Sequence, residues 1–399
     1  MRFPRRLCSS VVDSPAMTDT YLLSAPIPPP LRGEEIGSFA HDTITRRLPM
    51  IGRRVLDEND LTPEAARAVA ALADEMPDAL VRPLRDPGAP DVALWDGYLA
   101  PYAGQNWLQV PWFVAEIYFY RRVLEATGYF QPGPGYGADP FALQKRLGLE
   151  HAQLDHGPDD MAAAILGALW GNQADLSLWP AGEGVSPGGA HLLADDTVAA
   201  TTLIAGLAAK GARADIVLDN AGAELVHDLA LADALITAGL HVVLHAKSHP
   251  TFVSDAMISD VRLTIDWLAA LTSPAAAIGA RLGLALNTGR LEVRDGWYWT
   301  SSLPGWDLPD DLRADLATSG LLISKGDANY RRWLGDRRWP YDAPLDRILA
   351  YLPAPMLLLR TCKSNMAAGL DPSRIADAEA RDPQWITGGR WGVIQLSTR

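Results

Sequence analysis

The chain has 399 residues, 48% of them hydrophobic, which supplies enough apolar side chains for a large core. At about 100 to 200 residues per domain, this length predicts two domains. The formal net charge of -13 argues against a nucleic-acid-binding protein with a broad basic face.

The two cysteines, Cys8 and Cys362, are too few and too far apart for a disulfide framework or a thiolate metal site. Such sparse cysteine usage is typical of a reducing compartment, so we expect a cytoplasmic protein. No stretch reaches the roughly 18 to 20 apolar residues that a membrane-spanning helix requires, so we expect no membrane partner.

Residues 1–30 are interpreted as a disordered leader. Arginines near the start are not followed by the continuous apolar stretch of a secretory signal. Both Met1 and Met17 are candidates for the first residue.

Residues 31–190 are expected to form a mostly helical domain. Apolar residues recur at near-helical spacing over 37–51, which predicts an amphipathic helix that ends near Pro49. A second helix is expected after Thr62, a suitable N-cap, because Pro63 suits the first turn. Two further helices are predicted at 111–127 and 161–171.

A Gly/Pro-rich stretch at 180–189 is the best candidate for a domain boundary. The remaining residues, 191–399, change in pattern to short apolar runs that alternate with helical segments. We therefore predict an α/β domain of the Rossmann-like, three-layer α/β/α class with a mostly parallel sheet.

The clearest unit of this domain is a strand, a helix and a second strand. The run 214–218 is rich in β-branched residues, 224–238 is helical up to Gly239, and 241–245 is apolar again. This spacing predicts parallel strands joined by a right-handed crossover. Further strands are expected at 321–324, 356–359 and 393–396, with helices at 259–271 and 308–319.

Ligands of open parallel sheets bind at the carboxyl ends of the strands. Asp219 and Asn220 follow the first of these strands, and Gly222 allows a tight turn into the next helix. Two oxygen donors there suit a hard divalent cation. The alternative is an Asx turn that caps the helix.

Ser254 and Asp255 follow the second strand and its loop, just before another helical stretch. Either one alone is typical of a helix N-cap. Together with Asp219 and Asn220, Asp255 completes a possible three-ligand oxygen site for a metal ion.

Polar and basic side chains also follow two later strands. The segment 325–331 places Lys, Asp, Asn, Tyr and Arg within seven positions, with a solvated loop as the alternative reading. Arg360, Thr361 and Lys363 leave the strand at 356–359, and this pair of cations suits local capture of a phosphate. The alternative for them is a surface strand end.

Two other classes of site are disfavoured. Phosphatases with an aspartyl nucleophile usually carry a second Asp two positions later, but Ala221 follows Asp219 at that spacing. No G-x-G-x-x-G follows the strand at 214–218, which argues against a dinucleotide site.

Eight segments, spread in order over nearly the whole chain, resemble the damage-control phosphatase family (domain of unknown function 89), and more narrowly its subfamily III with the RTxK signature. They are GSFAHDTITRRLP at 37–49, PWFVAEIYFYRR at 111–122, LWGNQADLS at 169–177, VLDNAGAELVHDL at 217–229, FVSD at 252–255, KGDANYRRWLGDRRW at 325–339, RTCK at 360–363 and WITGGRWGVIQ at 385–395.

The resemblance implies a helical N-terminal domain, a Rossmann-like domain with a divalent metal, and hydrolysis of sugar phosphates such as fructose 1-phosphate and fructose 6-phosphate. Mn²⁺ is the expected metal, with Co²⁺, Ni²⁺ or Mg²⁺ as alternatives. By resemblance, Asp219, Asn220 and Asp255 hold the metal. The expected substrate-binding residues are Asp327, Ala328, Asn329, Tyr330, Arg331, Lys363, Arg360 and Asn172.

Two other functions stay open at this point. Relatives have been described as methyltransferases that transfer a methyl group from S-adenosylmethionine to protein carboxylates, although the sequence lacks a Gly-rich loop after a first strand. A sugar-phosphate sensor without catalysis would use the same ligands. The sequence carries no prediction of the oligomeric state.

Overall fold

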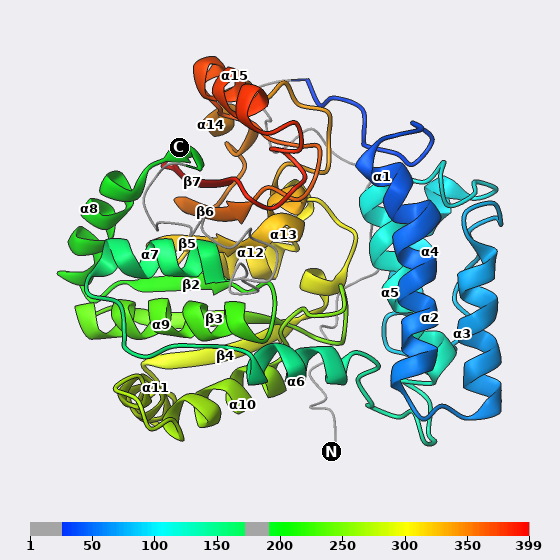
Figure 1. The fold of residues 1–399 in the computed structure, drawn as a ribbon, viewed down its shortest axis with the longest axis horizontal. Coiled ribbons are helices and arrows are strands. Elements are labelled where there is room, and N and C mark those ends of the chain that lie inside the picture. Colours follow the sequence, from blue (N-terminus) through cyan, green and yellow to red (C-terminus); the bar gives the residue numbers. More distant parts are fainter. Residues whose placement is uncertain (1–25, 172–190, 399) are drawn as a thin grey trace.

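The computed structural model describes residues 26–171 and 191–398. Its centre is a seven-stranded sheet in the order β1-β7-β6-β5-β2-β3-β4, flanked by helices (Figure 1). The strands are β1 Leu192–Asp195, β2 Arg213–Val217, β3 His241–Lys247, β4 Leu291–Gly296, β5 Leu321–Lys325, β6 Met356–Thr361 and β7 Gly392–Ser397.

The five strands from β6 to β4 are parallel to one another. Strand β7 runs antiparallel to β6, and β1 is parallel to β7, so these two strands oppose the other five. The expected mostly parallel α/β sheet is confirmed. Because β2, β3, β5 and β6 share one direction, their carboxyl ends lie at one edge of the sheet.

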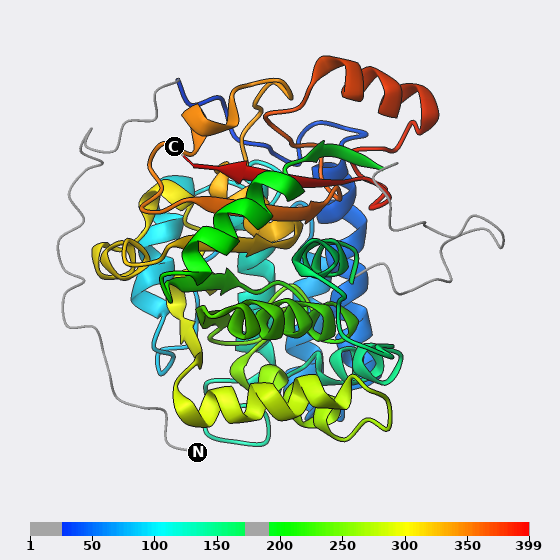
Figure 2. The ribbon, with the colours of Figure 1, turned by 90° about the vertical axis from the view of Figure 1, so that its left-hand side faces the viewer.

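The two faces of the sheet belong to different hydrophobic clusters, as the alternation of side chains along a strand requires. In β5, Leu321 and Ile323 pack on the face covered by helices α7 to α11, whereas Leu322 packs on the opposite face. That opposite face is shared with α12, α13, α14 and the N-terminal helices. Figure 2 shows the layers from the side.

The described part of the first half is mostly helical, as predicted. Its helices are α1 Phe39–Asp42, α2 Leu48–Glu58, α3 Pro63–Glu75, α4 Val92–Leu99, α5 Trp112–Thr127, α6 Ala142–Glu150 and α7 Met161–Trp170. Thr62 caps α3 by accepting a hydrogen bond from the backbone N–H of Ala65 (3.3 Å). Helices α1 to α5 lie beside the sheet in Figure 1, and α7 packs on α9 and β6.

The helix predicted to end near Pro49 does not end there. A π-helical turn at Thr43–Arg47 joins α1 to α2, and Pro49 lies in the first turn of α2, which continues to Glu58. Proline lacks an N–H and is tolerated in a first turn. The wider π turn before it lets the chain continue as a helix.

The helices of the second half are α8 Thr197–Ala208, α9 Ala223–Ala238, α10 Ile258–Ala269, α11 Ala276–Thr288, α12 Asp310–Leu316, α13 Gly326–Trp333, α14 Leu345–Ile348 and α15 Pro372–Arg381. The predicted strand, helix and strand unit is confirmed as β2, α9 and β3, and Gly239 ends α9 in a left-handed conformation. Strands β1 and β4 were not predicted. Both are edge strands, and β4 (LEVRDG) carries charged residues that conceal its pattern.

The predicted boundary at 180–189 lies outside the described residues, so the division of the chain at 190 stays a prediction. Residues 1–25 of the predicted leader also lie outside them. Pro29 and Pro30, by contrast, pair with Arg338 and Arg337 at the backbone. No helix of the described ranges is long and apolar enough to cross a membrane.

A buried ion-pair cluster joins the N-terminal helices to the sheet. Arg331 of α13 donates to Glu116 of α5 (2.6 Å) and to Asp336 (2.8 Å), and its guanidinium lies 3.5 Å from the ring centroid of Trp112. Asp336 also accepts from the backbone N–H of Phe113 (3.1 Å). The cluster therefore fixes α5 relative to the carboxyl end of β5.

Replacing Arg331 with Met should lower the free energy of unfolding by about 3–5 kcal/mol, because two buried carboxylates lose their partner. The control is Arg338→Met, which breaks the exposed pair with Glu35 (2.7 Å) and should cost about 0–1 kcal/mol. Urea unfolding of both variants gives the comparison. Equal losses would mean that the buried cluster does not join the two parts.

Candidate active site

The predicted metal ligands are brought together at the carboxyl ends of β2 and β3. Asn220 and Asp255 pair as an isolated antiparallel bridge, and the N–H of Ala256 donates to the carbonyl of Asp219 (2.8 Å). Ser254 donates its hydroxyl to Asn220 Oδ1 (2.5 Å). Hydrogen bonds thus join residues that lie 34 positions apart in the sequence.

Neither Asp219 and Asn220 nor Ser254 and Asp255 cap the helix that follows them. Helix α9 has Gly222 at its N-cap, with φ +76°, and it has no side-chain cap hydrogen bond. Helix α10 begins only at Ile258, and Asp260 accepts from the N–H of Met257 (2.8 Å) at its start. The capping alternatives for Asp219, Asn220, Ser254 and Asp255 are therefore wrong.

The carboxylates of Asp219 and Asp255 are both buried, and burial disfavours their charged form. Burial, followed by the charges of Glu224 and Asp255, raises the pKa of Asp219 well above its usual value, against the charges of Lys247 and Lys363. Burial also raises the pKa of Asp255, against the charge of Lys247. Burial thus disfavours both carboxylate charges, and the nearby lysines offset this effect only in part.

Lys247 was missed by the sequence reasoning. It is the last residue of β3, it is 3% exposed, and its ammonium lies 3.1 Å from Asp255 Oδ2. It also donates to the carbonyl of Leu218 (3.2 Å) and to Asn329 Oδ1 (3.4 Å). A lysine that ends a strand beside two strand-tip carboxylates is a signal that the sequence did contain.

Glu224 was missed as well, because it reads as an ordinary helix residue. It lies in the first turn of α9, and its Oε2 accepts from Asn220 Nδ2 (2.8 Å), which also donates to Asp219 Oδ2 (2.8 Å). Lys325, at the end of β5, lies 3.1 Å from Glu224 Oε1 and 3.1 Å from Asp228 Oδ1. A second, fully buried charge cluster therefore supports the first.

Gly326 lets α13 pass close to the strand tip of β2. Its φ is +81°, and a Cβ atom built on it would overlap the carboxylate of Asp219. The segment predicted as either a functional cluster or a solvated loop is mostly a buried helix, so the loop alternative is wrong.

Asp327 organises the loop that follows β6. Its Oδ1 accepts from Arg360 Nε (2.7 Å), from the N–H of Lys363 (3.2 Å) and from the hydroxyl of Ser364 (3.0 Å). Burial alone would raise the pKa of Asp327, but the charge of Arg360 acts in the opposite direction, and the pKa is lower than usual. Arg360 is fully buried, which excludes the surface-strand alternative.

Several residues predicted to contact substrate have other partners in this structure. Arg360 also donates to the carbonyls of Met366 (2.6 Å) and Ser364 (3.1 Å). Tyr330 is fully buried and donates to Gln395 Oε1 (3.2 Å).

Three more predicted residues are placed as follows. Asn329 is 1% exposed and donates to the carbonyls of Leu218 (3.0 Å) and Lys325 (2.9 Å). Ala328 is half-buried, and Asn172 lies outside the described residues. The Arg331 side chain is held by the ion-pair cluster with Glu116.

Lys363 is the predicted cation with most freedom. Its side chain is half-buried, and its charge lowers the pKa values of both Asp219 and Glu224. The ammonium therefore acts on the carboxylates, while the backbone of Lys363 is held by Asp327. This arrangement can present a phosphate to a positive group beside the two strand-tip carboxylates.

The donor set fits a hard divalent cation. In the part of the chain that the structure describes, Oδ1 of the buried Asp255 carboxylate has no hydrogen-bond partner, and Oδ2 has its ion pair with Lys247 (3.1 Å). Two carboxylates and an amide are ligands that such cations accept. The described residues contain no group of three His, Cys, Asp or Glu side chains placed to hold a metal, so a cation at this position would also require the amide of Asn220.

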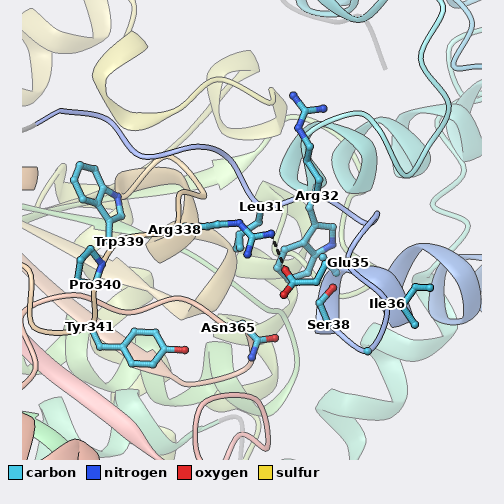
Figure 3. Close-up of a pocket in the computed structure, with 13 residues that line it drawn as sticks. Leu31, Arg32, Glu35, Ile36, Ser38, Arg338, Trp339, Pro340, Tyr341 and Asn365 are labelled. Atoms are coloured by element: carbon cyan, nitrogen blue, oxygen red, sulfur yellow. Dashed lines mark ion pairs between the residues drawn. The ribbon is translucent and has the colours of Figure 1, made fainter.

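A cavity of about 610 Å³ lies next to the loop after β6 (Figure 3). Asn365, two positions after Lys363, lies on its wall and accepts from the N–H of Phe39 (3.2 Å). Arg338 and Glu35 form their ion pair on the same wall. The lining does not include Asp219, Asn220 or Asp255, so the cavity is distinct from the candidate cation site.

A mostly parallel sheet with buried carboxylates and cations at the carboxyl ends of four strands defines the class of α/β proteins that bind small ligands at that edge. Residues 43–377 match the model of the damage-control phosphatase ARMT1-like domain. The chain belongs to this family and so falls among the phosphatases.

Curated relatives support this assignment over almost their whole length. Damage-control phosphatase ARMT1 of Danio rerio is 32% identical over 91% of this chain and 95% of its own. The Mus musculus protein is 30% identical over 92% of this chain and 98% of its own length. The Homo sapiens protein is 28% identical over 93% of this chain and 99% of its own length. A crystal structure of a DUF89 family protein from Pyrococcus horikoshii aligns with a TM-score of 0.48 at 14% identity, covering 88% of this chain and 96% of that one.

Replacing Gly326 with Ala should destabilise the fold more than Gly104→Ala. Both glycines have similar φ values, +81° and +80°, but nothing lies within 4 Å of a Cβ at Gly104. Each variant should lose about 1–2 kcal/mol from the left-handed backbone, and Gly326→Ala should lose more because its methyl group displaces Asp219. Chemical denaturation measures both losses, and equal values would contradict the close approach.

The pH dependence of stability should change in Asp228→Asn. Burial, opposed by Lys325 and reinforced by Glu224, raises the pKa of Asp228 to about 7. The unfolded value is about 3.9, so between about pH 4 and pH 7 the folded state binds more protons, and the free energy of unfolding falls as the pH rises.

The variant should remove this contribution, which is at most about 1.4 kcal/mol per pH unit. Its stability profile between pH 5 and 7 should therefore slope downward less than that of the unmodified protein. Thermal or urea unfolding at a series of pH values measures the difference. Parallel profiles would mean that Asp228 has an ordinary pKa in the folded protein.

Proposed function

We propose that this protein is a divalent-cation-dependent phosphatase that hydrolyses small sugar phosphates of the fructose 1-phosphate or fructose 6-phosphate type in the cytoplasm. The observation that carries the proposal is the buried Asp255 carboxylate beside Asp219 and Asn220, whose Oδ1 lacks a hydrogen-bond partner in the described residues and whose Oδ2 contacts only the Lys247 ammonium. The preference for fructose phosphates rests on the resemblance of the segments at 325–339 and 360–363 to subfamily III.

In this proposal Asp219, Asn220 and Asp255 hold the cation, with Mn²⁺ as the first choice and Co²⁺, Ni²⁺ or Mg²⁺ as alternatives. A cation bound there would neutralise phosphoryl charge and lower the pKa of a water molecule. Burial disfavours the charged forms of Asp219 and Asp255, and a cation bound at this position would favour them.

The remaining residues of the site position the phosphate and the ligands. Lys363 supplies a point charge to the phosphoryl group, and Asp327 fixes the backbone from which this side chain extends. Lys247 balances Asp255, while Glu224 holds the Asn220 amide. Arg331 and Arg360 keep the surrounding elements in place rather than contacting the substrate.

Asp255→Asn should retain the fold and lose at least about a hundredfold in metal-stimulated phosphate release, because one ligand charge is removed while its shape is kept. Release of inorganic phosphate from a panel of sugar phosphates, with Mn²⁺, Co²⁺, Ni²⁺ and Mg²⁺ compared, measures the effect. Unchanged turnover would reject Asp255 as a ligand.

Lys363→Ala should mainly raise KM for the sugar phosphate, by about tenfold or more, because it removes a charge that faces the phosphate. Lys210→Ala is the matched control, since Lys210 is exposed and follows α8, away from the site. A loss confined to thermal stability would assign Lys363 a structural role.

The same assays separate the two alternatives. Release of inorganic phosphate excludes a sugar-phosphate sensor without catalysis. Calorimetric titration with S-adenosylmethionine in the absence of metal tests the carboxyl methyltransferase, which requires binding of this compound.

A further inference from the structure

The loop between β3 and α10 contains an unusual backbone turn just before Asp255. Phe252 has φ +47° and Val253 has φ +65°, both in the left-handed region. The N–H of Ser254 donates to the carbonyl of Phe252 (2.7 Å), which closes a three-residue γ-turn around Val253. A γ-turn with positive φ at its centre is rare and strained, and a β-branched residue fits that region poorly.

The surrounding structure holds this turn from both sides. The Phe252 ring packs against Tyr120 of α5, with centroids 5.2 Å apart, and against Phe113 at 6.4 Å. On the other side, the N–H of Ala221 donates to the carbonyl of Ser254 (2.6 Å). Residues 252–254 thus contact α5 at one end and the segment after β2 at the other.

The turn decides where the Asp255 carboxylate lies. The N–H of Asp255 donates to the carbonyl of Thr251 (3.3 Å), so the backbone of Asp255 is hydrogen-bonded across the turn. Backbone strain of this kind persists only when the surroundings over-determine it, and it gathers at functional sites. A relaxed loop would leave Asp255 free to move away from Asn220.

We propose that Val253 is a positioning residue, whose strained γ-turn, anchored on α5 through Phe252, holds Asp255 in place for the cation at the expense of fold stability. This inference rests on the proposed cation site. It links the N-terminal helices to the site through a backbone turn rather than through a side chain that contacts the substrate.

The test is Val253→Gly, since glycine adopts a positive φ without strain and also permits many other conformations. The melting temperature should rise, while the dissociation constant for Mn²⁺ should increase by about tenfold. Mn²⁺ binding is followed by the electron paramagnetic resonance signal of the free ion, and stability by calorimetry of the cation-free protein. A merely structural role would move stability and affinity in the same direction.

Val253→Asn is the second variant, because asparagine tolerates the left-handed region and still restricts the loop more than glycine does. It should bind Mn²⁺ more tightly than the glycine variant does. Val81→Gly is the control. Val81 is a half-buried loop valine without a positive φ, so this change should lower stability and leave Mn²⁺ binding unaltered.

The possible outcomes are distinct. If the unmodified protein binds no Mn²⁺, the proposed cation site fails. If the unmodified protein binds Mn²⁺ and Val253→Gly binds it equally well, the cation site stands and the positioning role of Val253 is overturned. A fall in melting temperature in Val253→Gly, with or without weaker binding, would also overturn the proposal that strain is maintained for function.

Discussion

The burial of two carboxylates, Asp219 and Asp255, at neighbouring strand tips is the constraint on which the rest of the site depends. Burial raises both pKa values, and the charges of Glu224 and Asp255 raise that of Asp219 further, so positive charge nearby stabilises the ionised forms. Lys247 and Lys363 supply part of it from the ends of β3 and β6. The part of the burial effect that they leave uncompensated is the basis of our proposal that a divalent cation binds here.

In the described part of the chain, the cations around these two carboxylates fall into two kinds, those paired with buried carboxylates and one that is not. Lys325 balances Glu224 and Asp228 beneath the site, and Arg360 balances Asp327 beside it. These cations are fully committed to buried partners, which makes them parts of the scaffold. Lys363 is different, because its backbone is held by Asp327 while its side chain remains half-buried.

The N-terminal helices take part in the site through α5. The Arg331 cluster fixes α5 against α13, and the Tyr120 ring meets Phe252 of the loop that carries Asp255. The separation of Arg331 and Glu116 by 215 positions shows how far in sequence such contacts reach. Membership in the damage-control phosphatase ARMT1-like family spans both parts of the chain, since the match covers residues 43–377.

The sequence by itself determined the parallel α/β sheet and the polar residues that end its strands, because hydrophobic runs and strand-tip residues are local features. The prediction of Asp219, Asn220 and Asp255 as cation ligands was made in this way. Only the tertiary structure decided which charges remain available. Arg331 and Arg360 lie in the predicted segments, yet their partners come from distant elements, so pattern alone could not show that they are committed.

Two further features depended on packing. The short or charged edge strands β1 and β4 carry weak local patterns, so their hydrogen-bonded neighbours place them in the sheet. The γ-turn at Val253 contradicts the preference of a β-branched residue, and contacts with α5 and β2 impose it. The local sequence sets the conformational preference of each residue, whereas tertiary contacts decide where the backbone departs from that preference.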